Sequence, residues 1–271
     1  MPPTVAACQL DVADLDVAAN LDAVENRVRG LPERVDVALF PEYALTGFVA
    51  DDRVEEIALE RDGARVARIE DLARSEETAL LVGFVERDGD TLYNAATYVD
   101  PDGSKTVYRK RHLWGGERDV LAAGDELVTV DSPLGEAGIC TCYDLNFVGD
   151  SAELTDRAVD ALFVIGAWPA THSENWTLLL RARALDGVRW AVGAGRTGRR
   201  EIDGAREVAY AGRSLVARPD GGVHASLDRR PDDLVVDLDP DALARQRELV
   251  GIYEGAGDAD DGPESASRPV E

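Results

Sequence analysis

Lysine is almost absent from this sequence. Of 29 basic residues only Lys105 and Lys110 are lysines, whereas aspartate and glutamate together number 53, which gives a formal net charge of −24. A surface this acidic repels nucleic acids and anionic membranes, so neither is an expected partner. An acidic, lysine-poor composition is typical of proteins from halophiles with concentrated internal salt, where ions screen the self-repulsion. We therefore expect a halophilic source and lower stability at low salt.

Cysteine, long apolar runs and an export signal are also scarce or lacking. Three cysteines are few and odd in number, which argues against a disulfide framework and suits a reducing cytoplasm. No apolar run approaches the roughly 20 residues that a membrane-spanning helix needs, and the opening stretch MPPTVAACQL has no basic region of a signal peptide. Hydrophobic residues still make up 45% of the 271 positions, enough for a sizeable core. The sequence thus predicts a cytoplasmic globular protein.

Strand-like and helix-like segments follow one another in the same order in both halves of the chain. In the first half, apolar runs and helical spacing predict strands at 4–10, 36–42, 78–86 and 93–100, and helices at 16–31 and 62–75. In the second half they predict strands at 135–142, 160–167 and 188–195, a hairpin at 212–227, and helices at 150–159 and 173–187. Two such halves predict an α/β fold, a four-layer α-β-β-α sandwich in which two mixed sheets lie face to face.

The apolar content vanishes near the end of the sequence. We therefore expect a single domain over residues 1–254, followed by an acidic, disordered tail over 255–271.

A glycine-rich stretch, GAGRTG at 193–198, matches the spacing of a dinucleotide-binding fingerprint. That fingerprint requires a helix directly afterwards, because the pyrophosphate binds at the helix N-terminus. The sequence that follows, RREIDGAREVAYAG, contains an Asp-Gly turn and no apolar helical stripe. We therefore reject a dinucleotide site and expect no organic cofactor.

Cys140 and Cys142 stand one residue apart in GICTCYDLNF, at 138–147. A structural zinc site usually has four ligands in spaced pairs, and a redox pair usually has C-x-x-C spacing. Neither pattern is present, so no metal is expected. Both side chains would point to the same face of a strand, but Cys142 stands at its end, where open α/β sheets tend to place their chemistry. At this point a core thiol and a nucleophile both remain open for Cys142.

Two other charged residues stand at the ends of expected strands. Glu42 follows a buried strand in LFPEYALTGF, where a carboxylate is costly unless it is used or paired. Lys110 ends the strand in YRKRHLW, in a chain that otherwise uses arginine almost everywhere. An ammonium is a compact donor suited to a single oxyanion, whereas guanidinium suits carboxylates. Taken singly, a buried cap and a solvated strand-end charge are the simpler interpretations.

Together these stretches resemble the nitrilase superfamily of carbon–nitrogen hydrolases. The family's P-E…G-F, Y-x-K-x-H-L and I-C-Y-D-L-x-F signatures are matched, in the family's order, at Glu42, Lys110 and Cys142. The stretch ERDVLAAGD resembles the family's E-x-x-x-L-x-x-G and identifies Glu117 as its second glutamate. Similar stretches also occur at 167–187 and 212–222, and the likeness runs from Cys8 to about residue 240. The resemblance implies the same four-layer sandwich.

The resemblance implies that Cys142 attacks an amide carbonyl and forms a thioester. Glu42 would act as the general base, while the cation of Lys110 would favour the thiolate. Lys110 and the backbone N–H of Tyr143 would stabilise the oxyanion, and Glu117 would orient Lys110 or the leaving nitrogen. Cys140 would then belong to the core. The resemblance implies no metal and no cofactor.

One stretch departs from the family pattern. Some branches carry an arginine after N-W-P that binds a substrate carboxylate, whereas this chain reads Trp168-Pro169-Ala170-Thr171-His172. Trp168 is expected at the substrate pocket. A carboxylate-bearing substrate would need another partner, for which His172 and Arg196 are the candidates.

The resulting prediction is an amidase that releases ammonia and a carboxylic acid from a small linear amide, acting as a homo-oligomer, most simply a dimer. An N-carbamoyl amidohydrolase and a nitrilase are alternatives, because they share the same four residues and differ in pocket shape. A non-enzymatic acidic binding or regulatory module on the same fold is a further alternative. That module would be expected to lack at least one of the four residues, and the sequence retains all of them.

Overall fold

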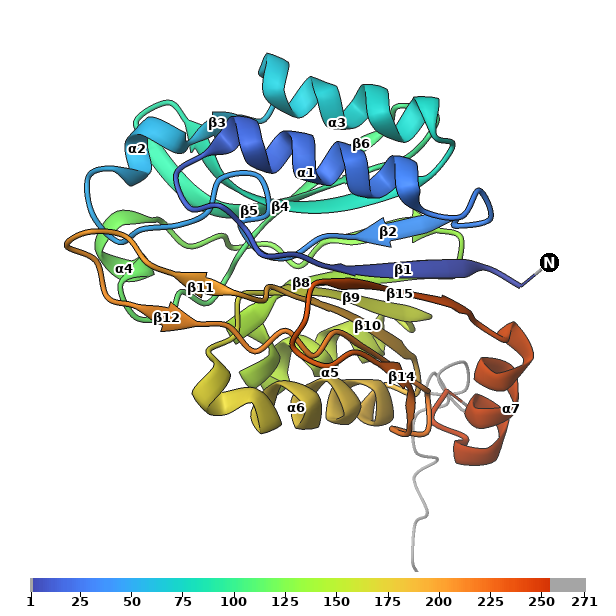
Figure 1. The fold of residues 1–271 in the computed structure, drawn as a ribbon. Coiled ribbons are helices and arrows are strands. Elements are labelled where there is room, and N and C mark those ends of the chain that lie inside the picture. Colours follow the sequence, from blue (N-terminus) through green and yellow to red (C-terminus); the bar gives the residue numbers. More distant parts are fainter. Residues whose placement is uncertain (1, 254–271) are drawn as a thin grey trace, which may run out of the picture.

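Two β-sheets lie face to face between two layers of helices (Figure 1). The computed structural model describes residues 2–253, so the expected tail at 255–271 lies outside the described residues. Helices α1 (Val17–Gly30) and α3 (Ala64–Ser75) cover one sheet, and α5 (Val148–Asp156) and α6 (Ser173–Asp186) cover the other. The four-layer α-β-β-α sandwich predicted from the sequence is confirmed.

The first sheet has the strand order β15-β1-β2-β4-β5-β6, with β3 paired to β4. Its strands are β1 (Thr4–Gln9), β2 (Val37–Leu39), β3 (Leu59–Glu60), β4 (Ala79–Asp88), β5 (Thr91–Val99), β6 (Lys105–Arg109) and β15 (Asp232–Asp237). Strands β1, β2 and β4 are parallel, whereas β4–β5 and β5–β6 are antiparallel pairs. The sheet is therefore mixed, as predicted.

The second sheet has the order β14-β13-β10-β9-β8-β7. Its strands are β7 (Thr129–Ser132), β8 (Gly135–Thr141), β9 (Ala161–Gly166), β10 (Trp190–Gly195), β13 (Leu215–Ala217) and β14 (Val223–Ser226). Its central strands β8, β9 and β10 are parallel. A separate hairpin is formed by β11 (Arg199–Arg200) and β12 (Val208–Ala209). The remaining elements are α2 (Val54–Ile57), α4 (Glu117–Val120), α7 (Pro240–Val250) and the 3-10 turns η1 (Cys142–Asn146) and η2 (Ala170–His172).

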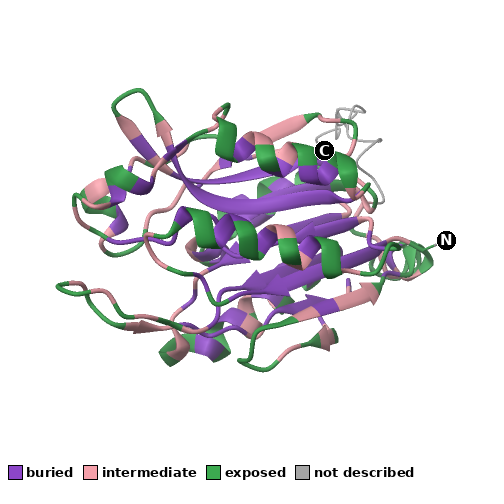
Figure 2. Cartoon of the chain, turned by 45° about the horizontal axis from the view of Figure 1, so that its top comes forward, coloured by how far each residue is buried: buried purple, intermediate pink, exposed green. Residues whose placement is uncertain are grey.

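Helix α1 illustrates how the sequence pattern specifies packing. The Asp16 side chain accepts a hydrogen bond from the backbone N–H of Ala19 and so caps the first turn. The predicted apolar stripe, which includes Leu21 and Val24, is buried against the first sheet. Figure 2 shows the result for the helices as a group, with buried inner faces and exposed outer faces.

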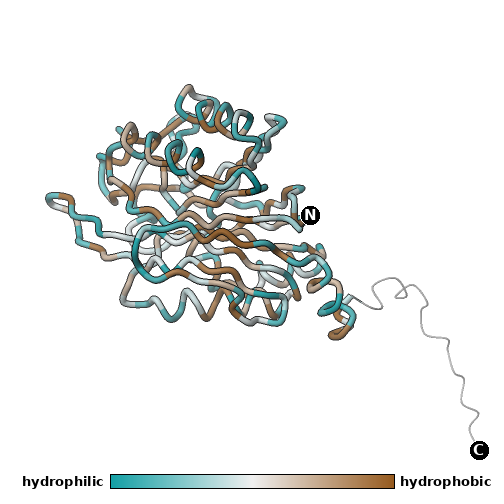
Figure 3. The backbone as a smooth tube through the Cα atoms, turned by 45° about the vertical axis from the view of Figure 1, so that its right-hand side comes forward, coloured by the Kyte–Doolittle hydropathy of each residue, from teal (hydrophilic) through white to brown (hydrophobic). Residues whose placement is uncertain are grey.

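The apolar core consists of three clusters that follow the layers. One joins the first sheet to α1 and α3, one lies between the sheets and contains Leu39, Phe163 and Val192, and one joins the second sheet to α6 through Trp176 and Leu180. In Figure 3, the hydrophobic segments of the backbone run through the middle of the molecule and the hydrophilic segments lie outside. Of the described helices, none has the length and hydropathy to cross a membrane.

The final strand joins the sheet of the first half. Strand β15 pairs antiparallel with β1, from Thr4 opposite Asp237 to Gln9 opposite Asp232. The sequence pattern did not predict this strand or α7. The glycine-rich stretch at 193–198 leads into the β11–β12 hairpin, so the helix that a dinucleotide fingerprint requires does not follow it.

Strand ends from both sheets meet on one side of the molecule. Glu42 follows β2 and Lys110 follows β6 in the first sheet, whereas Cys142 follows β8 in the second. The backbone N–H of Ala167, directly after β9, donates a 2.6 Å hydrogen bond to Glu42 Oε2. A carboxylate from one sheet is thus tied to the backbone of the other.

Gly83 on β4 leaves space for the turn that carries Glu42. A Cβ at Gly83 would lie 2.6 Å from the carbonyl oxygen of Pro41 and 2.8 Å from Cα of Glu42, and both of these are backbone atoms. We expect Gly83→Ala to lower the free energy of unfolding by about 1–3 kcal/mol, because overpacking forces the backbone to shift. The measurement is a urea denaturation midpoint.

Gly30→Ala is the matched control, because an added Cβ there meets no atom within 4 Å. It should leave the midpoint unchanged or raise it, since alanine favours helix. Equal midpoints for Gly83→Ala and the unsubstituted protein would contradict the close-approach argument.

Candidate active site

Cys142 occupies a strained turn between β8 and η1. Its φ is +51°, in the left-handed region that residues with a side chain rarely adopt. The side chain is nearly buried, at 8% exposure, yet it lines a cavity. Strain of this kind concentrates at functional sites, where the surrounding structure holds the residue in place. The turn presents the thiol at the end of the strand, as predicted.

The Asp144 carboxylate fixes that turn. It accepts hydrogen bonds from the Tyr108 hydroxyl at 2.6 Å, the backbone N–H of Thr141 at 2.9 Å and the backbone N–H of His112 at 3.0 Å. Burial raises the pKa of Asp144 to about 6, against the effect of Lys110 and of these donors. Asp144 therefore joins the thiol turn of the second sheet to β6 of the first.

Glu42 sits on a turn at the end of β2 and is almost fully buried, at 1% exposure. Oε2 accepts from the backbone N–H of Ala167, while Oε1 accepts from Lys110 Nζ at 2.8 Å and from Asn94 Nδ2 at 2.7 Å. The next residue, Tyr43, has a φ of +61°. A buried carboxylate needs such partners, and Glu42 has them.

Lys110 lies between two buried carboxylates. Nζ contacts Glu42 Oε1 at 2.8 Å and both carboxylate oxygens of Glu117 at 2.9 Å. Burial alone would lower the pKa of Lys110, but the charges of Glu117 and Glu42 raise it well above its usual value. The lysine is therefore held as an ammonium in a water-excluded setting.

Glu117 begins the short helix α4. Burial alone would raise its pKa, yet the ammonium of Lys110 lowers it, so Glu117 is ionised. Further donors reach it from the Tyr43 hydroxyl, from Asn94 Nδ2 at 2.9 Å and from the backbone N–H of Trp114 at 2.7 Å. Asn94 thus touches both glutamates from strand β5.

Asn94 was not singled out from the sequence. The signal that would have found it is an asparagine inside an apolar strand, where this residue type is depleted.

The thiol of Cys142 is protonated in the resting structure. Burial raises its pKa well above the usual value, and the charge of Glu42 raises it further, with Lys110 opposing both. Lys110 lowers the pKa of Cys142 and so favours the thiolate, as expected, but burial and the charges of Glu42 and Glu117 outweigh its effect. A base must remove the thiol proton during reaction. Glu42 lies close enough for its charge to raise the pKa of the thiol, and it is therefore the candidate base.

Two adjoining cavities lead to the thiol. The inner cavity, about 170 Å³, is lined by Cys142, Tyr143, Trp168, His172 and other residues. The outer cavity, about 430 Å³, is lined by Tyr43, Phe48, Glu117 and residues of the β11–β12 hairpin. The two share Trp114, Pro169 and His172 as lining residues, so they adjoin, and the smaller is called inner because it alone is lined by Cys142.

Three of the four predicted substrate-binding residues line the inner cavity. These are Tyr143, Trp168 and His172, and Trp168 Nε1 is fixed by a 2.9 Å bond to the carbonyl of His172. Arg196 is placed elsewhere. It is fully buried, forms an ion pair with Asp14 and is absent from the walls of both cavities. Its charge is thus already neutralised, and the structure gives it no contact with the space beside the thiol.

A histidine and two aspartates, residue types that bind metals, lie together near the site, but their side chains already form hydrogen bonds within the protein. Within residues 2–253, the only such group has ligand atoms of His112, Asp144 and Asp150 within 4.8 Å of one another. Asp144 accepts the three donors described above. Asp150 accepts from Arg111 at 2.8 Å and bonds His112 Nε2 at 2.9 Å. These carboxylates serve protein donors, so the cluster does not fit a metal site.

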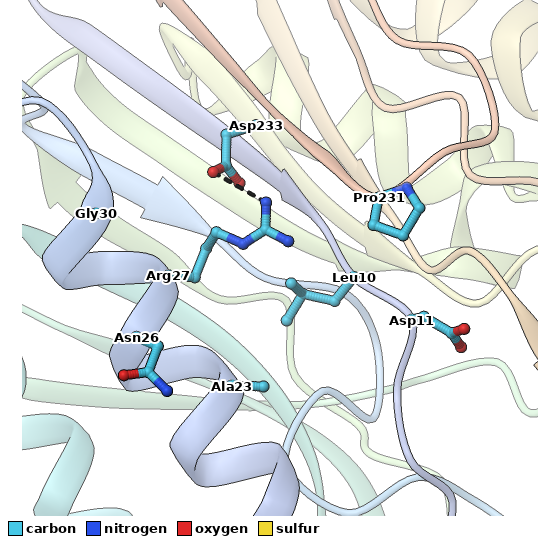
Figure 4. A pocket seen from close by; sticks show the side chains of 8 residues that line it. All are labelled: Leu10, Asp11, Ala23, Asn26, Arg27, Gly30, Pro231 and Asp233. Carbon is cyan, nitrogen blue, oxygen red and sulfur yellow. Dashed lines mark ion pairs between the residues drawn. The ribbon is translucent and has the colours of Figure 1, made fainter.

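A separate surface hollow of about 400 Å³ lies between α1 and the β1–β15 pair (Figure 4). Arg27 and Asp233 form an ion pair of 3.0 Å across it, and Asn26 points into the same region. The hollow has no cysteine, serine, threonine or lysine among its lining residues. The cavities beside Cys142 are therefore the stronger candidates for the active site.

Comparison with known proteins agrees with this geometry. A family model described as carbon–nitrogen hydrolase matches residues 4–248. The chain is 29% identical over 239 residues to an (R)-stereoselective amidase from Pseudomonas sp, covering 88% of this chain and 86% of that protein. It is 32% identical over 253 residues to a deaminated glutathione amidase from Dictyostelium discoideum, covering 85% and 83%. The solved structure of XC1258 from Xanthomonas campestris, a CN-hydrolase superfamily protein with an arsenic adduct in its active site, has a TM-score of 0.83 at 26% identity, covering 94% and 97%.

Glu42→Gln should lower the pKa of the Cys142 thiol, because the charge of Glu42 contributes to its elevation. The measurement is the rate of iodoacetamide alkylation against pH, with the adduct mapped to Cys142 by mass spectrometry. The midpoint of that rate should move to lower pH in the variant, since the thiolate is the nucleophile.

Glu136→Gln removes an exposed carboxylate from the same strand β8 and should leave the midpoint in place. Cys140 and Cys8 line neither cavity and should react more slowly than Cys142. A midpoint that rises in Glu42→Gln would refute the charge assignment.

Proposed function

Since the chain belongs to the carbon–nitrogen hydrolase (nitrilase) superfamily and is a hydrolase of carbon–nitrogen bonds other than peptide bonds, we propose that it hydrolyses a small linear amide through a thioester on Cys142. The observation that carries this proposal is the arrangement of one protonated thiol, one buried carboxylate and one buried ammonium beside a cavity. Each group has a distinct role in acyl transfer.

In the first half-reaction, Glu42 takes the proton of the Cys142 thiol as the sulfur bonds to the amide carbon. Lys110 Nζ turns one of its three N–H donors toward the oxygen that becomes negative. The backbone N–H of Tyr143 is the second donor, because it lies in the first turn of η1, where N–H groups have no partner within the helix. Two donors thus face the developing charge.

Collapse of this intermediate breaks the carbon–nitrogen bond. Glu42 returns the proton to the departing nitrogen, and ammonia leaves. A water molecule then gives a proton to Glu42 and attacks the thioester carbon, and the proton finally returns to the sulfur. The products are a carboxylic acid, ammonia and the original thiol. Glu117 acts through Lys110, because it holds the ammonium in position.

Amidases outnumber nitrilases among the names of the similar proteins, which favours an amide substrate. An (R)-stereoselective amidase, a deaminated glutathione amidase and a 2-oxoglutaramate amidase from Paenarthrobacter nicotinovorans (27% identical) are all similar to this chain. The small inner cavity also favours an unbranched group beside the reacting carbon. An N-carbamoyl amidohydrolase and a nitrilase are the competing assignments, and a substrate panel separates all three.

The purified protein should release ammonia and a carboxylic acid in equal amounts from short linear amides. The panel contains linear amides, N-carbamoyl compounds and nitriles, with ammonia and carbon dioxide measured together. Multimolar salt is used because the net charge of −24 requires screening, as proposed for a halophilic protein. Cys142→Ala is the control and should release nothing.

Carbon dioxide in proportion to ammonia would instead assign an N-carbamoyl amidohydrolase. Turnover of nitriles without turnover of amides would assign a nitrilase. No turnover of any class in the folded protein would favour the non-enzymatic binding module. A dimeric state and a cytoplasmic location stay predictions of the sequence.

Lys110→Arg should lower kcat by about 10²–10³-fold, which is the typical effect of losing one oxyanion donor. A planar guanidinium pairs along the Glu117 carboxylate and does not place a single N–H at the oxyanion. The measurement is kcat on the best amide of the panel, with the urea midpoint measured in parallel to confirm folding.

Lys105→Arg is the matched control, because the only other lysine forms ion pairs with Asp62 and Glu70 away from both cavities. It should retain full kcat. Near-normal turnover of a folded Lys110→Arg protein would remove Lys110 from the oxyanion role.

A further inference from the structure

The β11–β12 hairpin places two arginines on the wall of the outer cavity, and neither forms an ion pair within residues 2–253. Arg200 directs its guanidinium to backbone carbonyls, at 3.2 Å to Phe48 and at 3.0 Å to Arg206. The exposed Arg206 side chain has neither a salt bridge nor a hydrogen bond in the described part of the chain. The donors of Arg206 are therefore available to a molecule in the cavity.

This availability contrasts with the arginines around it. Acidic residues outnumber basic ones by 53 to 29 in the sequence, and many surface guanidinium groups have a carboxylate partner. Arg53, near the same hairpin, pairs with Asp51 at 2.7 Å, and Arg196 pairs with Asp14 at 2.6 Å. The two arginines of the hairpin, which have no carboxylate partner in the described part of the chain, thus offer an anion a local positive site on a strongly negative protein.

Arg200 holds the β11–β12 hairpin, and with it Arg206, in place. Its guanidinium donates hydrogen bonds to the backbone carbonyls of both Phe48 and Arg206, and so connects the hairpin to the loop that follows Glu42. In that loop, Phe48 stacks on Tyr43 with ring centroids 4.7 Å apart, and the Tyr43 hydroxyl bonds Glu117. Arg200 is therefore connected through Phe48 and Tyr43 to the Glu117 carboxylate.

We propose that Arg206, positioned by Arg200, binds a carboxylate at the far end of a linear amide substrate. This inference rests on the proposed amide hydrolysis and names the substrate class. A guanidinium presents paired N–H donors that match the two oxygens of a carboxylate. The site is distinct from Arg196 and lies on the hairpin, which sequence reasoning treated only as evidence against a dinucleotide site.

The sizes of the cavities determine where the carboxylate lies. Ligand pockets usually occupy about 300–1,000 Å³, so the inner cavity of about 170 Å³ accommodates the amide end and a few adjoining carbons. The outer cavity accommodates the rest of the molecule. Its aromatic residues Phe48 and Trp114 provide apolar surface for a methylene chain, and Arg206 receives the terminal charge.

The unpaired carboxylate on the hairpin opposes this binding, and removing it gives a test with the opposite expected sign. Glu207 lines the same cavity and forms no ion pair with Arg206 or Arg200 in the described part of the chain. Glu117 also lines this cavity but is paired with Lys110, so the hairpin side of the wall contributes two arginines against one glutamate. Removing Glu207 should therefore strengthen the binding of an anionic substrate, whereas removing Arg206 should weaken it.

The kinetic experiment compares adipic acid monoamide with hexanamide, a neutral amide of the same carbon-chain length, at one fixed salt concentration. The quantity measured is the ratio of kcat/KM for the anionic amide to kcat/KM for the neutral amide. Arg206→Gln should lower this ratio about 10- to 100-fold through KM, the range for losing a hydrogen bond to a charged group. Glu207→Gln should raise it.

Arg199→Gln is the matched control. Arg199 precedes Arg200 on β11, so its side chain points to the opposite face, and it lines a separate hollow with Asp11 and Glu201. The control removes the same charge from the same hairpin and should leave the ratio unchanged. An unchanged ratio in Arg206→Gln, or an equal fall in Arg199→Gln, would overturn the proposal.

A binding measurement separates this inference from the proposed reaction. Titration calorimetry of adipic acid monoamide into Cys142→Ala requires no turnover, and its Kd should rise about 10- to 100-fold on adding Arg206→Gln. If no amide is hydrolysed while this difference persists, the reaction assignment fails and the carboxylate site stands. If amides are hydrolysed and Kd does not change, the carboxylate site alone is refuted.

Discussion

The ammonium of Lys110, buried between Glu42 and Glu117, is the interaction on which the rest of the site depends. Breaking a buried ion pair by removing one partner typically costs about 3–5 kcal/mol, because an uncompensated charge is left behind. Here one cation serves two carboxylates, so the cluster retains a net negative charge. Neutral donors, including Asn94 and the backbone N–H groups of Trp114 and Ala167, supply the remaining stabilisation.

That charge cluster also joins the two sheets. Glu42 belongs to the first sheet and accepts from the backbone after β9 of the second, while Asp144 beside the thiol accepts from Tyr108 of β6. The turns at Cys142 and Tyr43 both have positive φ, a conformation that must be maintained by surrounding contacts. The face-to-face packing of the sheets therefore both stabilises the fold and sets the position of the thiol relative to the carboxylate.

Burial and the balance of charge around Cys142 set the state of the thiol from which the proposed acyl transfer begins. Burial raises the pKa of the thiol well above its usual value, and the charges of Glu42 and Glu117 add to this against the opposing ammonium of Lys110. In the proposed mechanism, proton removal and carbon–sulfur bond formation therefore belong to the same step, and the base must lie within reach of the thiol. This arrangement differs from a preformed thiolate pair, in which a cation dominates the surroundings of the sulfur.

The sequence by itself determined the four layers and the succession of most strands and helices, because local periodicity records them. Its short motifs also singled out Glu42, Lys110, Glu117 and Cys142, which the structure brings together. It did not reveal the strand β15 beside β1, the contacts of Asn94 with both glutamates, or which arginine faces the cavity. Arg196 and Arg206 are equally charged in the sequence. Only the tertiary structure places Asp14 against Arg196 and leaves Arg206 on the wall, because ion pairing depends on residues far apart in the chain.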